Sequence, residues 1–107
     1  MRWYNYLYIG EKATKNSDAI IDGIKNGKIQ LNKYVLALPF NDSDMLDIYP
    51  STILIQKHYL KSDIVIVGIA EGMEEAKDLV QEIIMECYTE TGDFKLKDYI
   101  FAGGVSG

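Results

Sequence analysis

The sequence predicts a small single-domain α/β protein with the element order βαβαβα around a central, mostly parallel sheet. Three observations indicate this fold class. An unbroken apolar run covers 63–70, the longest helical periodicity in the chain follows it directly, and a second stretch without a polar face lies at 33–38. Strands that are apolar on both faces are typical of a sheet covered by helices on both sides. A chain of 107 residues is enough for one such domain.

We expect 63–70 to be the central strand, because it is β-branched at five of its eight positions and has no polar residue after Asp63. A helix is predicted to begin at Gly72 and to end before Gly92, because apolar residues recur there at three- and four-residue steps. Glycine is accepted as an N-cap, and glycine past a C-terminus can adopt the left-handed conformation that ends a helix. Strand and helix together form the unit around which the other elements are arranged.

The other elements are predicted in chain order. A strand is expected at 3–9, a short helix from Asn16 or Ser17 to Lys25, and a strand at 33–38 that stops at Pro39. A helix is expected at 45–60, although 51–55 also suits a strand. The sequence allows a fourth, edge strand at 93–101. The domain is therefore expected to cover 1–102, with 103–107 as a flexible tail.

A second topology remains open if the chain between 39 and 62 is a hairpin connection instead of a helix. The order is then βαββαβ, which is the ferredoxin-like α+β arrangement with one open sheet face. Tyrosine and isoleucine would lie on that face. Because an open apolar face usually pairs with another subunit, we expect a homodimer under either topology.

The predicted helix at 72–91 has an acidic side that suggests a partner surface. Its acids follow one another at four-residue steps, with Lys77 as the only base between them: Glu74, Asp78, Glu82, Glu86 and Glu90. A solvated helix face explains this pattern, and so does docking of a basic protein partner on Asp78, Glu82 and Glu86. Nucleic acid is not expected as a partner, because the net charge of −5 repels phosphate.

Tyr4, Tyr6 and Tyr8 alternate along the first predicted strand and share one of its faces. We expect their rings to cover a helix or a second copy of the chain while the hydroxyl groups reach water. A platform for a small molecule is the alternative. The three tyrosines are therefore the predicted surface for self-association.

A ligand corner is predicted where the carboxyl ends of parallel strands meet. Three loops would converge there, and their polar or flexible residues form the predicted site: Gly10, Lys12, Asn41, Ser43, Gly68, Glu71 and Gly72. The last loop resembles a phosphate-binding turn only superficially. It lacks the glycine spacing of such turns, and Glu71 and nearby acids would repel an anion.

The sequence contains no pattern typical of catalysis or metal binding. His58 is the only histidine and has no carboxylate close to it in the sequence, and Cys87 is the only cysteine and falls on the apolar side of the predicted helix. The aspartates near Asn41 are explained by helix capping. We therefore expect no catalytic residue, no cofactor and no metal.

The leading prediction for function is a non-catalytic, self-associating interaction or regulatory module that offers its acidic helix to a partner. The alternative is a small-ligand binder or minor enzyme that uses the loops at the strand ends. No apolar run approaches the roughly 18–20 residues that cross a membrane, and 1–6 do not resemble a secretory signal. A cytoplasmic location without membrane contact is therefore expected.

Overall fold

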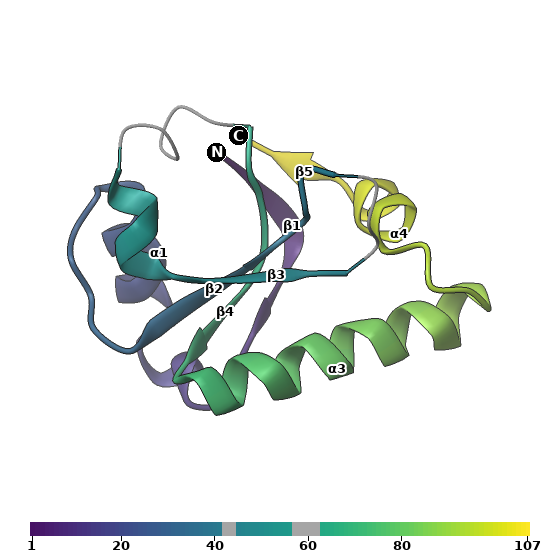
Figure 1. Ribbon diagram of the computed structural model, residues 1–107, viewed down its shortest axis with the longest axis horizontal. Coiled ribbons are helices and arrows are strands. Elements are labelled where there is room, and N and C mark those ends of the chain that lie inside the picture. The colour runs from purple at the N-terminus through teal and green to yellow at the C-terminus, as the bar shows by residue number, and fades with distance from the viewer. Residues whose placement is uncertain (42–44, 57–62) are drawn as a thin grey trace.

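The computed structural model of the chain describes residues 1–41, 45–56 and 63–107. These residues form a five-stranded mixed sheet with the strand order β3-β2-β4-β1-β5 and helices on both faces (Figure 1). The strands are β1 (Arg2–Ile9), β2 (Lys33–Ala37), β3 (Asp47–Pro50), β4 (Val65–Glu71) and β5 (Val105–Ser106). The helices described are α1 (Ser17–Lys25), α3 (Met73–Thr91) and α4 (Leu96–Gly103), with the short 3-10 helices η1 (Ala13–Asn16) and η2 (Ser51–Ile55).

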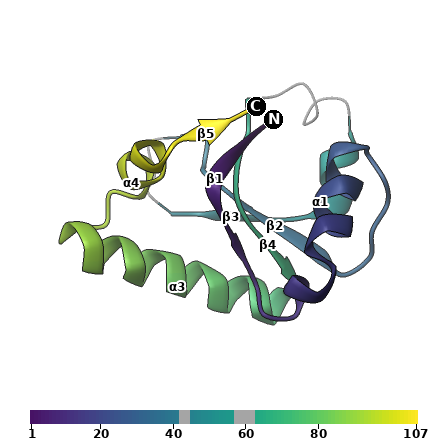
Figure 2. The same ribbon diagram turned by 180° about the vertical axis from the view of Figure 1, so that it is seen from behind.

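The central strand β4 is covered on both faces, as the sequence predicts. Ile66, Val67 and Ile69 have no exposed surface, and β4 lies in the middle of the strand order. One face of the sheet packs against α3 and α4, and the other packs against α1, η1 and η2 (Figure 2). Burial from two sides explains why this stretch tolerates no polar side chain.

A register shift in β4 changes which residues face which helix. Strict alternation along a strand would place Ile69 on the same face as Val67. Instead, Ile69 packs on the α1 side with Ile66, and Ala70 packs on the α3 side with Val67. The pairing of β2 with β4 shifts between Leu36 and Ala37, as at a β-bulge, which accounts for the change of face.

Strand directions differ from the predicted mostly parallel sheet. Only β1 and β4 pair in parallel among the described strands, whereas β2 is antiparallel to β4 and to β3, and β5 is antiparallel to β1. The antiparallel direction of β2 follows from the connection between α1 and β2, which returns the chain to the carboxyl end of β4. There the Gly72 N–H donates to the Asn32 carbonyl at 2.9 Å, so β2 begins beside the end of β4. The ferredoxin-like alternative does not match either, because it leaves one sheet face open.

Two predicted elements need correction. Within the helix predicted at 45–60, residues 47–50 form the edge strand β3 and 51–55 form η2, while 57–62 lie outside the described residues. Pro50 ends β3 at the sheet edge, where a missing N–H is tolerated. The edge strand predicted at 93–101 is instead α4, because Leu96 and Ile100 bury one helical face.

The predicted flexible tail contains the fifth strand. Val105 pairs with Tyr4 and Ser106 pairs with Trp3, so the two chain ends lie side by side in the sheet (Figures 1 and 2). The predicted helices at 16–25 and 72–91 are confirmed within a residue or two, with Gly92 in the left-handed conformation past α3. None of the helices in the described ranges has the length and apolar character needed to cross a membrane.

Candidate functional site

The parallel pair β1 and β4 brings two loops together at one edge of the sheet. The turn after β1, which starts at Gly10, meets the turn after β4 at Glu71 and Gly72. The first turn leads into η1 and the second into α3. Two of the three loops of the predicted ligand corner therefore converge.

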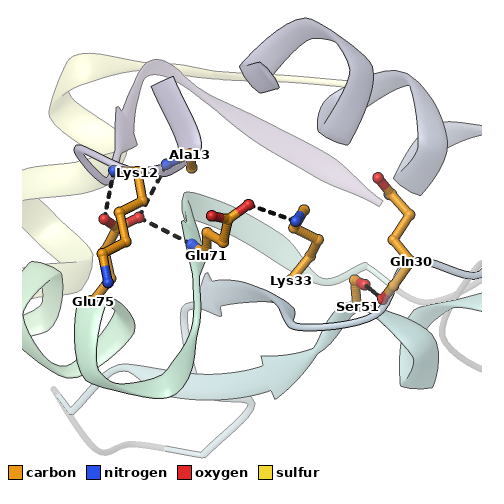
Figure 3. A network of polar contacts seen from close by, with 7 residues as sticks. All are labelled: Lys12, Ala13, Gln30, Lys33, Ser51, Glu71 and Glu75. Atoms are coloured by element: carbon orange, nitrogen blue, oxygen red, sulfur yellow. Dashed lines mark hydrogen bonds and ion pairs between the residues drawn. The ribbon is translucent and has the colours of Figure 1, made fainter. Parts of the chain in front are cut away.

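Glu75 joins these two loops through its carboxylate (Figure 3). The backbone N–H groups of Lys12, Ala13 and Glu71 donate to its oxygens at 2.6, 3.2 and 2.9 Å. Partial burial opposes ionisation, but these hydrogen bonds and the Lys12 charge outweigh it and hold the pKa of Glu75 below its ordinary value. The corner thus contains an anion-binding cradle of backbone amides that one of the chain's own carboxylates occupies.

Two glycines predicted as ligand contacts have structural roles here. A Cβ on Gly10 would lie 2.1 Å from a Glu75 carboxylate oxygen, so only glycine leaves room for that side chain. Gly72 has a φ of 86° and stands at the N-cap of α3, in a left-handed region that glycine adopts without strain. Gly68 belongs to the core, because a Cβ there would touch Leu79 and Tyr8.

Glu71 is held in an ion pair at the rim of this corner. The Lys33 ammonium lies 2.6 Å from its carboxylate, and both side chains are mostly covered (Figure 3). Beyond Lys33, the Ser51 hydroxyl donates to the Gln30 carbonyl at 3.0 Å. These contacts fix the start of β2 against the end of β4.

A hollow of about 630 Å³ opens beside Glu75, between the β1–η1 turn and the first turns of α3. Its lining includes Lys12 and Lys15 together with six carboxylates: Glu11, Glu71, Glu74, Glu75, Asp78 and Glu82. Acids therefore outnumber bases there, and negative potential accumulates in such a concave surface. Within the described ranges, no group of three or more histidine, cysteine or acidic side chains is placed to hold a metal ion.

Asn41 lies outside this hollow, contrary to the prediction. It follows β2, whose antiparallel direction carries its C-terminal end away from the carboxyl ends of β1 and β4. Its carbonyl accepts a hydrogen bond from the Lys97 ammonium near the start of α4. Ser43 and His58 lie outside the described residues.

The predicted interaction residues divide between two places. Asp78 and Glu82 line the acidic hollow, whereas Glu86 lies farther along α3 beside the tyrosines of β1. Tyr4 is buried, with 6% of its surface exposed, while Tyr6 is 70% exposed. The chain's own helices therefore cover Tyr4, whereas the Tyr6 ring stays exposed, so the tyrosine face is covered only in part.

Sequence reasoning missed the role of Glu75. Its position, three residues after the N-cap, is where a glutamate commonly reaches back to backbone N–H groups, so this signal was present. Its partners Lys12 and Ala13 are more than 60 residues away in sequence, and only the parallel pairing of β1 with β4 brings them close. Tyr99 was missed for a similar reason, because it belongs to a helix that the sequence did not predict.

Fold and site together define a small α+β domain with an acidic hollow at the carboxyl ends of two parallel strands. Comparison of the chain with models of protein families, with curated proteins and with solved structures finds no match.

Proposed function

We propose that the chain is a non-catalytic binding module that docks a basic segment of another protein along the acidic side of α3. The observation that supports this function best is the hollow of about 630 Å³, in which six carboxylates stand against two lysines. A cationic partner is attracted to such a surface and an anionic one is repelled. Basic peptides are therefore favoured over phosphate-bearing ligands.

Two surfaces predicted separately coincide in this proposal. The corner residues Lys12 and Glu71 and the helix residues Asp78 and Glu82 line the same hollow. Glu71 and Glu75 are engaged by Lys33 and by backbone N–H groups, respectively. Asp78 and Glu82 are exposed on α3, and they are the carboxylates that we expect to contact the partner.

Titration with a fluorescently labelled oligolysine peptide tests the proposal. Reversing Asp78 and Glu82 together to lysine is expected to weaken peptide binding by at least about tenfold at low salt. The matched control reverses Asp18 and Glu90, which gives the same change in net charge outside the hollow. Equal losses in both double variants would contradict a defined docking surface, because net charge alone would then explain the binding.

A small cationic ligand is the second candidate, because the same hollow is large enough to hold a polyamine. Spermidine that displaces the peptide and binds at least as tightly would favour this alternative. A peptide that binds tightly and is not displaced by spermidine would favour the protein partner.

The homodimer and the cytoplasmic location also belong to this proposal. Exposure of large apolar side chains outside the tyrosine-lined surface, such as Ile29 at 71% and Leu31 at 79%, supports self-association. Sedimentation at micromolar concentration should then show a species heavier than the 12.1 kDa chain. A single monomeric species would contradict the dimer and leave the docking proposal intact.

A further inference from the structure

A second hollow, of about 450 Å³, lies between β1, the middle of α3 and α4. Its lining contains four tyrosines and one carboxylate: Tyr4, Tyr6, Tyr8, Tyr99 and Glu86. It shares no lining residue with the acidic hollow beside Glu75. What this second hollow recognises is therefore a separate question from the docking of a basic segment.

The tyrosine rings form two walls that meet at an angle. Tyr4 and Tyr8 lie nearly parallel, with 21° between their planes and 5.8 Å between ring centroids, whereas Tyr6 stands at 71° to Tyr4 with the centroids 5.9 Å apart. The Tyr4 ring is fixed from behind, because a Cβ on Gly103 would lie 2.7 Å from it. The Tyr4 ring is therefore fixed in place before any ligand arrives.

Glu86 adds a carboxylate to this aromatic corner. Burial and hydrogen bonding with Glu86 and Tyr99 raise the pKa of the Tyr8 hydroxyl, so this tyrosine stays neutral. The lining includes no lysine, arginine or histidine, and the ion pairs given for the described residues do not involve Glu86. Within the part of the chain that the structure describes, the hollow is thus lined by four tyrosine rings and a carboxylate, with no cationic side chain among its lining residues.

We propose that this hollow binds a small quaternary or alkylated ammonium compound such as choline. Aromatic faces attract a cation through their quadrupole, and the effect is strongest for a cation whose alkyl groups are easily desolvated. A carboxylate beside the rings supplies charge complementarity that a neutral ligand cannot use. An inorganic cation would gain less, because it would have to shed tightly held water to contact the rings.

Titration of the full chain with choline chloride tests the site, with amide and aromatic NMR shifts as the readout and sodium chloride at equal ionic strength as the blank. We expect saturable shifts on β1 and α4. The neutral analogue of choline, in which carbon replaces nitrogen, should bind about tenfold more weakly. Equal binding of choline and its neutral analogue would overturn the proposal, as would the absence of saturable shifts.

Two variants assign the binding to the hollow. Tyr6→Ala removes an exposed ring, and Glu86→Gln keeps the side-chain shape while removing the charge; each should weaken choline binding by about tenfold. Asp18→Asn, at an exposed position of α1 on the opposite face of the sheet, and Tyr88→Ala, whose ring stacks on Phe94 outside the hollow, are the matched controls and should bind as the parent does. Unchanged affinity in Glu86→Gln, the variant with the least effect on packing, would also overturn the proposal.

Discussion

At the scale of single residues, Glu75 links parts of the chain that are far apart in sequence. Its carboxylate accepts three backbone N–H groups, two from the turn after β1 and one from the end of β4. A buried or partly buried N–H group without an acceptor destabilises the folded state. The Glu75 carboxylate therefore stabilises the fold by accepting from N–H groups that the loops cannot pair on their own. Gly10 makes the arrangement sterically allowed.

Replacing Glu75 with glutamine should destabilise the fold in a pH-dependent way. At pH 7 we expect a loss of about 1–3 kcal/mol in the free energy of unfolding, because charge-assisted hydrogen bonds become neutral ones. The folded-state pKa of Glu75 lies below its ordinary value. Its stabilisation is therefore complete above the unfolded-state pKa of about 4.3 and is lost as the pH falls through the folded-state pKa.

Urea unfolding of both proteins at pH 7 and at about pH 3 measures this effect. The difference between parent and variant should shrink at the acidic pH, because the unfolded parent takes up a proton there, below its pKa of about 4.3. Glu74→Gln is the matched control, because that neighbouring side chain is 90% exposed, and its substitution should change stability by less than about 0.5 kcal/mol. A difference that is constant with pH would contradict the role of the ionised carboxylate.

At the scale of elements, α3 combines a buried stripe with an acidic side that repels itself. Ala76, Leu79, Ile83 and Cys87 are buried against the sheet. The acids on the other side follow at four-residue steps, and like charges at that spacing destabilise a helix. Tertiary burial therefore holds α3 in place. Repulsion between the acidic side chains lowers its stability, and a bound basic partner would reduce that repulsion.

Glu82→Lys should accordingly stabilise the isolated protein. The substitution turns two repulsive neighbours, Asp78 and Glu86, into attractive ones, and the expected gain is about 1 kcal/mol. Thermal unfolding at low and high salt measures it, and the gain should decrease with salt because the charges are screened. Glu82→Gln should give about half of the effect, and a destabilised lysine variant would contradict this account of the helix.

The sequence predicts the existence of the main elements better than their directions. Apolar periodicity locates α1, β2, β4 and α3 because local burial patterns specify them. The direction of β2 depends on how 26–32 return to the end of β4, through contacts such as the Gly72–Asn32 hydrogen bond, and no local pattern encodes such a contact. Strand direction also decides which predicted site residues meet. Gly10, Lys12 and Glu71 lie together because β1 and β4 are parallel. Asn41 lies elsewhere because β2 is antiparallel to β4.

At the scale of the whole molecule, the sheet is completed by residues from the C-terminal end of the chain. β5 covers the start of β1, where the Asn5 N–H donates to the Gly104 carbonyl at 2.9 Å and the Ser106 hydroxyl donates to the Asn5 side chain at 2.6 Å. Val105 packs against the core cluster on the α3 side. A segment with the composition of a flexible tail is thus held by pairing and packing, which its sequence does not reveal.

Deleting 104–107 should therefore cost stability, although three of the four deleted residues are glycine or serine. The deletion removes the pairing of β5 with Trp3 and Tyr4, uncovers part of Tyr4 and opens the edge of β1 to solvent. We expect the free energy of unfolding to fall by about 1–3 kcal/mol, the range for a few net hydrogen bonds together with one partly buried valine. Urea unfolding followed by circular dichroism measures the loss, and Ser106→Ala, which removes only the side-chain hydrogen bond, should cost less than about 1.5 kcal/mol. An unchanged free energy of unfolding in the truncated chain would mean that these residues move freely, as their composition alone predicts, and that β1 is stable as the edge strand of a four-stranded sheet.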